Sequence, residues 1–275
     1  MRTNIYDLLR QRGFDFKEEY RRLWVLLVEE KSIHYARYFC TLIDYIDKNY
    51  FRDLGFRDSY IEIYDMMQEL GLNDTTPDNV ECLYRLCEFL MAVLDNETAN
   101  KHPAINDQRR LIFENIIKIL DKTNHTAKKN AEGFWIIIEK KPDSTLAAEI
   151  VENDQASCDI FEYNHFALKG NLNDKRKILS NLANYVEPIL DSPNFPECNT
   201  LKNLRSDIRL FLNNMSIRHN NDEGKYAKNI MGKITDDELE EWYDKTYQMI
   251  LAVIIIMDYY KIRPDIEKLR KEIKN

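Results

Sequence analysis

The strongest constraint on the fold of this chain is an apolar run near its C-terminus. Nine consecutive apolar residues occupy positions 249–257. Their helix is predicted to begin at Thr235, because Thr235 and Glu238 have the spacing of a capping box, and it continues without Gly or Pro to about Ile262. Such a helix is apolar on most sides and must be buried by other elements. The run is shorter than the roughly 20 residues of a membrane span, so the sequence predicts a helical bundle around it and no membrane segment.

Composition favours the same fold class. Only seven Gly and seven Pro occur in 275 residues, 31% of the residues are charged, and the net charge is -8. These values are typical of a mainly α protein. The acidic balance argues against general affinity for DNA or anionic lipid, although a local basic patch remains compatible with it. The five cysteines include no C-x-x-C pair and the N-terminus has no signal-peptide core, so we expect free thiols and a cytoplasmic protein.

One small β-hairpin is predicted within the multi-helix bundle. Residues 134–140 are rich in β-branched and aromatic side chains and follow a turn-like sequence at 130–133. With residues 125–129 as the other arm, the hairpin covers about residues 125–140 and is the only strand signal that we identify.

Helices are expected along the rest of the chain, and no heptad array is apparent. The polar stretch that ends at Pro103 suggests a boundary between an N-terminal helical region, 1–102, and a region 103–275, although one continuous domain is the alternative. The expected elements include a helix over 32–46 capped by Ser32, a helix that starts at Thr76-Pro77, a helix capped by Asn173, and a final solvated helix over 263–275.

The polar segment between the last two apolar helix patterns contains the residues best suited to chemistry. A guanidinium can bind phosphate bidentately, and an imidazole titrates near neutral pH. Arg218 could therefore stabilise the charge on a phosphorane while His219 removes a 2′-hydroxyl proton and Asn220 orients the RNA substrate, without metal or cofactor. Alternatively, Arg218 pairs with an acid such as Glu223, and His219 or Asn220 caps a helix.

Basic residues outnumber acidic ones between positions 199 and 233, which suits a phosphate-bearing ligand. A second basic run at 175–177 is interpreted as a solvated face. The acidic run at 236–241 could suggest a metal site, but acids at a helix start more often offset the helix dipole, so no metal is expected. The residues predicted to contact phosphate or RNA are Arg209, Lys225, Lys228, His165 and Lys169.

A C-terminal helix pair with an Arg- and His-bearing polar segment between them resembles the HEPN superfamily of helical domains, found in many prokaryotic antiviral and toxin–antitoxin systems. The resemblance covers residues 201–262. It implies a bacterial-type defence or stress protein that engages RNA or nucleotide, with metal-independent endoribonuclease activity in a homodimer. The family motif separates Arg from His by four to six residues, whereas His219 follows Arg218 directly and Lys225 lies seven positions after Arg218. A non-cleaving version is therefore also compatible with the sequence.

A non-catalytic adaptor or accessory subunit of a larger ATPase- or nuclease-containing complex is the competing hypothesis. Aromatic residues are abundant in the N-terminal half, and exposed aromatics would indicate a surface for a protein partner. The aromatic residues in question are Tyr20, Trp24, Tyr35, Tyr38, Tyr45, Tyr50, Phe51, Tyr60 and Tyr64.

Overall fold

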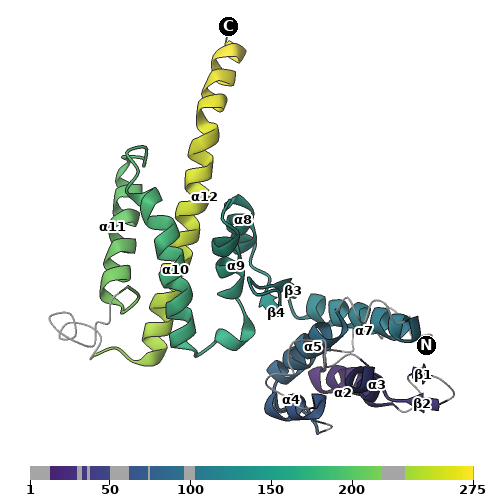
Figure 1. Cartoon of the computed structure of the whole chain (residues 1–275). Helices are drawn as coiled ribbons and strands as arrows, with labels where there is room; N and C mark the ends of the chain where they lie inside the picture. Colours follow the sequence, from purple (N-terminus) through teal and green to yellow (C-terminus); the bar gives the residue numbers. More distant parts are fainter. Residues whose placement is uncertain are drawn as a thin grey trace, which may run out of the picture. The chain divides into compact units, whose positions relative to one another are not determined.

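A computed structural model describes residues 13–29, 33–35, 38–49, 62–73, 75–95, 103–218 and 233–274. The chain divides into two compact units, Met1–Ala127 and Lys128–Asn275, and each is described by itself (Figure 1). The described residues are mainly helical and include the small hairpin predicted at about residues 125–140. The predicted fold class is therefore confirmed. None of the described helices has an apolar stretch long enough to cross a bilayer.

In the first unit, helix α2 packs against most of the other helices. Its elements are α2 (Phe16–Val28), β1 (Ile33–Tyr35), β2 (Tyr38–Cys40), α3 (Leu42–Asn49), α4 (Ile63–Glu69), α5 (Val80–Leu94) and α7 (Pro103–Lys122). Asp15 caps α2 by accepting a hydrogen bond from the N–H of Lys17 at 3.0 Å. From α2, Leu23 and Leu27 are buried where the helix packs on α3, α5 and α7. Burial of this one face holds the unit together.

The division between the units differs from the boundary suggested near Pro103. Helix α7 begins at Pro103 and packs on α2, α5 and β1, so it belongs to the first unit. The boundary between the two compact units therefore follows Ala127, within strand β3.

Strands β1 and β2 correct the helix expected over residues 32–46. They form an antiparallel pair in which His34 lies opposite Phe39, and helix α3 begins only at Leu42. The apolar spacing in this stretch resembled a helix, but its aromatic and β-branched residues also suit a short strand pair. The hairpin at 125–140 is thus not the only strand pair in the chain.

Strands β3 (His125–Lys129) and β4 (Trp135–Glu139) form the predicted hairpin. The side-chain oxygen of Asn130 accepts hydrogen bonds from the N–H groups of Glu132 at 3.1 Å and Phe134 at 2.9 Å. Gly133 has a φ of 85°, a conformation that disfavours residues with a Cβ. In β4, Ile136, Ile137 and Ile138 are all buried. The turn is therefore specified locally by Asn130 and Gly133.

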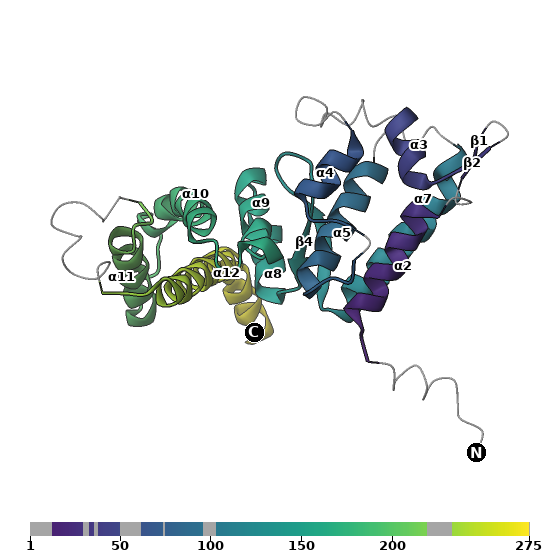
Figure 2. The same ribbon diagram turned by 90° about the horizontal axis from the view of Figure 1, so that it is seen from below.

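The second unit packs its helices around α12. Its helices are α8 (Pro142–Ile150), α9 (Asp154–Glu162), the short 3-10 helix η2 (Phe166–Leu168), α10 (Leu172–Leu190), α11 (Asn199–Asn214) and α12 (Asp236–Lys274). Helix α12 contacts α8, α10 and α11, and the two views place it between the α10–α11 pair and the α8–α9 pair (Figures 1 and 2). The apolar run at 249–257 contributes Ile250, Leu251, Val253 and Ile254 to the buried core, as its composition predicted.

Helix α12 begins as the sequence predicted but ends later than predicted. At its start, the Thr235 N–H donates to the Glu238 carboxylate at 2.9 Å and the Glu238 N–H donates to the Thr235 hydroxyl at 3.3 Å, so the predicted capping box is confirmed. Near the start, Trp242 stacks on Phe211 of α11, with ring centroids 4.9 Å apart. At the other end, the helix passes through Pro264 and continues to Lys274 as one element, whereas the sequence suggested an end near Ile262 and a separate final helix.

Two predicted helix starts were misplaced for the same reason. Helix α5 begins at Val80, because Asn79, and not the Thr76-Pro77 pair, caps it through a hydrogen bond from the Cys82 N–H at 3.2 Å. Helix α10 is likewise capped by Asn171, whose side chain accepts from the Asp174 N–H at 3.2 Å. Where two cap-type residues are close in sequence, local pattern does not select between them.

Candidate functional site

Arg218, the central residue of the predicted site, lies in a turn that folds back on the end of α11. The preceding residues Met215, Ser216 and Ile217 are buried, and the Arg218 N–H donates to the Leu212 carbonyl at 3.2 Å. The guanidinium forms an ion pair with Glu187 of α10. Arg218 therefore pairs with an acid, as in the predicted alternative; Glu223, the acid named there as an example, lies outside the described residues.

Two arginines of α11 approach the same end of α10. Arg209 forms an ion pair with Asp191, the residue that caps the C-terminus of α10. Arg205 donates to the Leu190 carbonyl at 3.4 Å and lies over the ring of Phe195, 5.3 Å from its centroid. The carbonyl groups at a helix C-terminus carry partial negative charge that attracts cations. Arg205, Arg209 and Arg218 thus bind the C-terminal end of α10.

The other predicted site residues are not gathered around Arg218. His219, Asn220, Lys225 and Lys228 lie outside the described residues, as does Glu223. His165 and Lys169 precede the N-terminus of α10, whereas Arg218 and Arg209 bind near its C-terminus. A helix of 19 residues is roughly 28 Å long. The predicted phosphate contacts that the structure describes are therefore divided between opposite ends of one helix.

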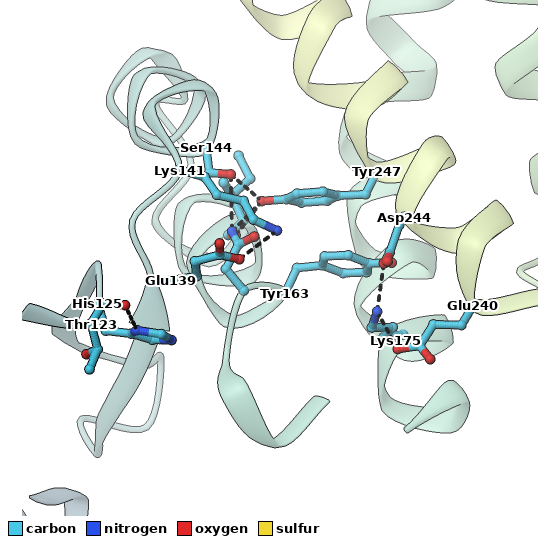
Figure 3. Close-up of polar contacts among 12 residues, drawn as sticks. Thr123, His125, Glu139, Lys141, Ser144, Tyr163, Lys175, Glu240, Asp244 and Tyr247 are labelled. Carbon is cyan, nitrogen blue, oxygen red and sulfur yellow. Dashed lines mark hydrogen bonds and ion pairs between the residues drawn. The ribbon is translucent and has the colours of Figure 1, made fainter. Parts of the chain in front are cut away.

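A second polar cluster, centred on Lys175, lies at the N-terminal end of α10 (Figure 3). The Lys175 ammonium is 2.7 Å from a carboxylate oxygen of Asp244 and 2.8 Å from one of Glu240. Only 8% of its side chain is exposed, and the ammonium lies 5.3 Å from the centroid of the Tyr163 ring. The Tyr163 hydroxyl donates to the same Asp244 oxygen at 2.9 Å. The cluster thus joins α10, α12 and the end of α9.

Tyr247, which follows Asp244 by three residues on α12, extends this cluster. Its ring stacks on that of Tyr163, with centroids 4.1 Å apart. Its hydroxyl donates to the Ile160 carbonyl at 2.7 Å and lies 3.0 Å from the Ser144 hydroxyl, and it accepts from the Asn164 amide at 2.8 Å. One phenol therefore ties α12 to α8, α9 and the turn after α9.

The protonation of the Lys175 cluster fits a structural role. Burial raises the pKa of Glu240, but hydrogen bonds from Lys175 and from the Gly170 N–H outweigh burial, and the pKa of Glu240 is lowered from its ordinary value. Burial, reinforced by Asp244, raises the pKa of the Tyr163 phenol, and burial also raises the pKa of Tyr247. At neutral pH the Glu240 carboxylate is therefore charged and both phenols are neutral hydrogen-bond donors.

Sequence patterns gave only part of this cluster. The basic run at 175–177 was interpreted as a solvated face, but Lys175 is buried, and only Arg176 and Lys177 are exposed. The acidic run at 236–241 was assigned to the helix dipole, yet Glu240 binds Lys175. The i,i+4 spacing of Glu240 and Asp244 places both carboxylates on one face of α12, which indicates a shared cation but not that the cation is Lys175.

His165 and Lys169 remain near this end of α10. His165 pairs with Ile138 in an isolated β-bridge, and its ring lies 4.7 Å from that of Phe166. Lys169 is exposed and lines an open depression of about 480 Å³ together with Asn171 and Asp236. Among the residues that the structure describes, no group of three His, Cys, Asp or Glu side chains gathers as metal ligands would.

In comparisons with known proteins, no family model, no curated protein and no solved structure matches this chain.

Proposed function

We propose that this chain is a non-catalytic helical interaction module, an adaptor or accessory subunit of a larger assembly. The observation that carries the proposal is the end of α12, which continues past the other helices of its unit (Figure 1) and exposes half or more of the side chains of Tyr259, Ile262, Leu269 and Ile273. Apolar side chains that follow one another along a protruding helix are typical of a surface for a protein partner.

The arginines of the predicted phosphate site support the same proposal. Arg218 and Arg209 each have a carboxylate partner within the chain, so a phosphate would have to displace Glu187 or Asp191. Of the N-terminal aromatics, Tyr20 and Tyr45 are buried in the core of the first unit, and the more exposed Tyr64 donates to Asp44 at 3.0 Å. Tyr50, Phe51 and Tyr60 lie outside the described residues. The described surface that best supports the proposal is therefore that of α12.

Purified full-length chain incubated with varied RNAs tests this function. We expect no cleavage and no tight binding, and we expect Arg218→Ala to behave as the wild type does. RNA cleavage by the wild type that disappears in a folded Arg218→Ala variant would contradict the proposal. Circular dichroism establishes that the variant retains its helices.

The second candidate function is engagement of RNA or nucleotide at Arg218. In it, His219 acts as general base and Asn220 orients the substrate. One observation favours it: 34% of the Arg218 side chain is exposed, and ion pairs at the surface exchange partners at small cost. Under this candidate, Glu187→Gln would free the guanidinium and strengthen RNA binding. Under the interaction-module proposal, the same substitution leaves RNA binding unchanged.

A further inference from the structure

The apolar side chains at the end of α12 follow a heptad pattern. Spacings of three and four residues alternate along the helix, so these side chains form one stripe in which the a positions are 259, 266 and 273 and the d positions are 262 and 269. The exposed fractions are 50% for Tyr259 and Ile262, 55% for Leu269 and 75% for Ile273. A coiled-coil seam has this spacing; here Ile266 is half-buried and the other four positions are exposed.

The charges beside the stripe identify the partner. The g positions hold Asp258, Asp265 and Glu272, and the e positions that follow Ile262 and Leu269 hold Arg263 and Arg270. In a parallel pair of helices, each g residue faces the e residue five positions later on the other helix. Two copies of this helix would therefore place Asp258 opposite Arg263 and Asp265 opposite Arg270, twice by symmetry.

An antiparallel pairing is opposed by the same charges. It would bring g positions together with g positions, and e positions with e positions, so that acid meets acid and arginine meets arginine. Ile266 at an a position and Leu269 at a d position is the combination that favours two strands, whereas Ile262 at the other d position does not add to this preference. Pro264 occupies an f position, on the side of the helix away from the seam, where its ring does not obstruct a partner.

We infer that residues 259–273 of α12 form a parallel two-stranded coiled coil with a second copy of this chain. Within one copy, Arg263 binds Glu267 of its own helix at 3.0 Å and lies 5.5 Å from the centroid of the Tyr260 ring, and the side chains of the ion pair are about half exposed. The pair is a surface contact that a facing aspartate can replace. The inference rests on the proposed function in that it supplies the interaction module with its partner.

The oligomeric state of the full-length chain, measured by light scattering over a range of concentrations, tests the inference. We expect a dimer for the wild type and a monomer for Leu269→Asp. The matched control is Leu210→Asp on α11, whose leucine is equally exposed, at 54%, but lies outside the stripe; this variant should remain dimeric. A wild type that stays monomeric, or a Leu269→Asp variant that stays dimeric, overturns the inference.

Charge variants keep the test decisive if Leu269→Asp unfolds. Arg263→Glu with Arg270→Glu leaves every apolar residue in place and makes all e and g positions acidic, so the dimer should be lost. A second variant makes all e and g positions basic through Asp258→Lys, Asp265→Lys and Glu272→Lys. This basic variant should be monomeric alone but should dimerise with the acidic variant. Failure of the mixture to dimerise contradicts the pairing.

Ile266→Cys determines the orientation. Only a parallel, in-register pair brings position 266 against itself, so oxidation should link two copies through this position, as identified by mass spectrometry of the linked peptide. Linkage absent from a dimeric sample contradicts the parallel pairing. These results separate the two proposals, because a monomeric wild type removes the dimer alone, whereas RNA cleavage lost in Arg218→Ala removes the proposed function.

Discussion

The ion pairs at the two ends of α10 differ in burial. At the N-terminal end, Lys175 is buried, with 8% of its side chain exposed, and it binds two carboxylates of α12. At the C-terminal end, Arg218 and Arg209 bind Glu187 and Asp191 with 34% and 43% of the arginine side chains exposed. The sequence shows a basic cluster at each end, but only one of them is part of the core.

The difference separates charges that specify packing from charges that solvent can replace. Removing one partner of a buried ion pair leaves the other charge without compensation, which is strongly destabilising, whereas ion pairs at the surface contribute about 0–1 kcal/mol. The ion pairs of Lys175 therefore specify the packing of α10 on α12. Arg218 and Arg209, at the exposed end, could bind other groups without unfolding of the chain.

The largest effect should follow from Lys175→Met, which keeps much of the aliphatic stem and removes the charge. We expect a loss of about 2–4 kcal/mol in the free energy of unfolding, below the full value for a buried pair because Asp244 is half exposed. Urea denaturation measures the change. The control is Lys177→Met, an exposed position on the same helix, which should change stability by less than about 0.5 kcal/mol. Equal effects of the two substitutions would contradict the distinction.

Tyr247→Phe should rank second. The substitution keeps the ring that stacks on Tyr163 but removes the hydroxyl that bonds Ile160, Ser144 and Asn164. Unpaired buried polar groups cost about 1–3 kcal/mol, and we expect a loss in this range by urea denaturation. Tyr259→Phe, at a half-exposed ring, serves as control and should be nearly neutral.

Low pH should reduce the free energy of unfolding through protonation of Glu240, at the buried end of α10. Because its pKa is lowered in the folded chain, its contribution to stability is fully present above its ordinary value of 4.5 and is lost as the pH falls through the lower, folded value. Glu240→Gln should therefore make the free energy of unfolding less dependent on pH in this acid range. The measurement is urea denaturation at a series of pH values from neutral downward, and an unchanged pH dependence would count against the role of Glu240.

The smallest effect is expected for Arg218→Ala. Its ion pair with Glu187 is partly exposed, so the free energy of unfolding should fall by about 0–1 kcal/mol. A loss comparable to that of Lys175→Met would show that the exposed end is as structural as the buried one. Thermal unfolding of the two variants side by side makes this comparison directly.

Local signals predicted the local structure well. The hairpin at about residues 125–140 and the capping box of Thr235 and Glu238 were both identified from sequence, because each is specified by neighbouring residues. The strand pair β1–β2 was missed because its apolar spacing also matches a helix face. The interaction of Lys175 with Glu240 joins positions far apart in the chain, and residue type alone does not reveal such pairs.

The end of α12 shows a different limit of sequence reasoning. Its stripe covers just over two heptads, fewer than the roughly three to four at which spacing alone indicates a coiled coil. Only the exposure of Leu269 and Ile273 in the structure distinguishes this stripe from an ordinary core face. The site residues His219 and Asn220 lie outside the described residues and stay predictions.

The stacking of Trp242 on Phe211 has a practical consequence for following how this chain unfolds. Trp242 reports on the contact between α11 and α12 in the second unit, while Trp24, stacked on Tyr20, reports on the first. Variants that keep one of these indoles, with phenylalanine at the other two tryptophan positions, would give each unit its own fluorescence signal. Coincident transitions would mean that the units melt as one cooperative body, and separate transitions would mean that each is an independent folding unit.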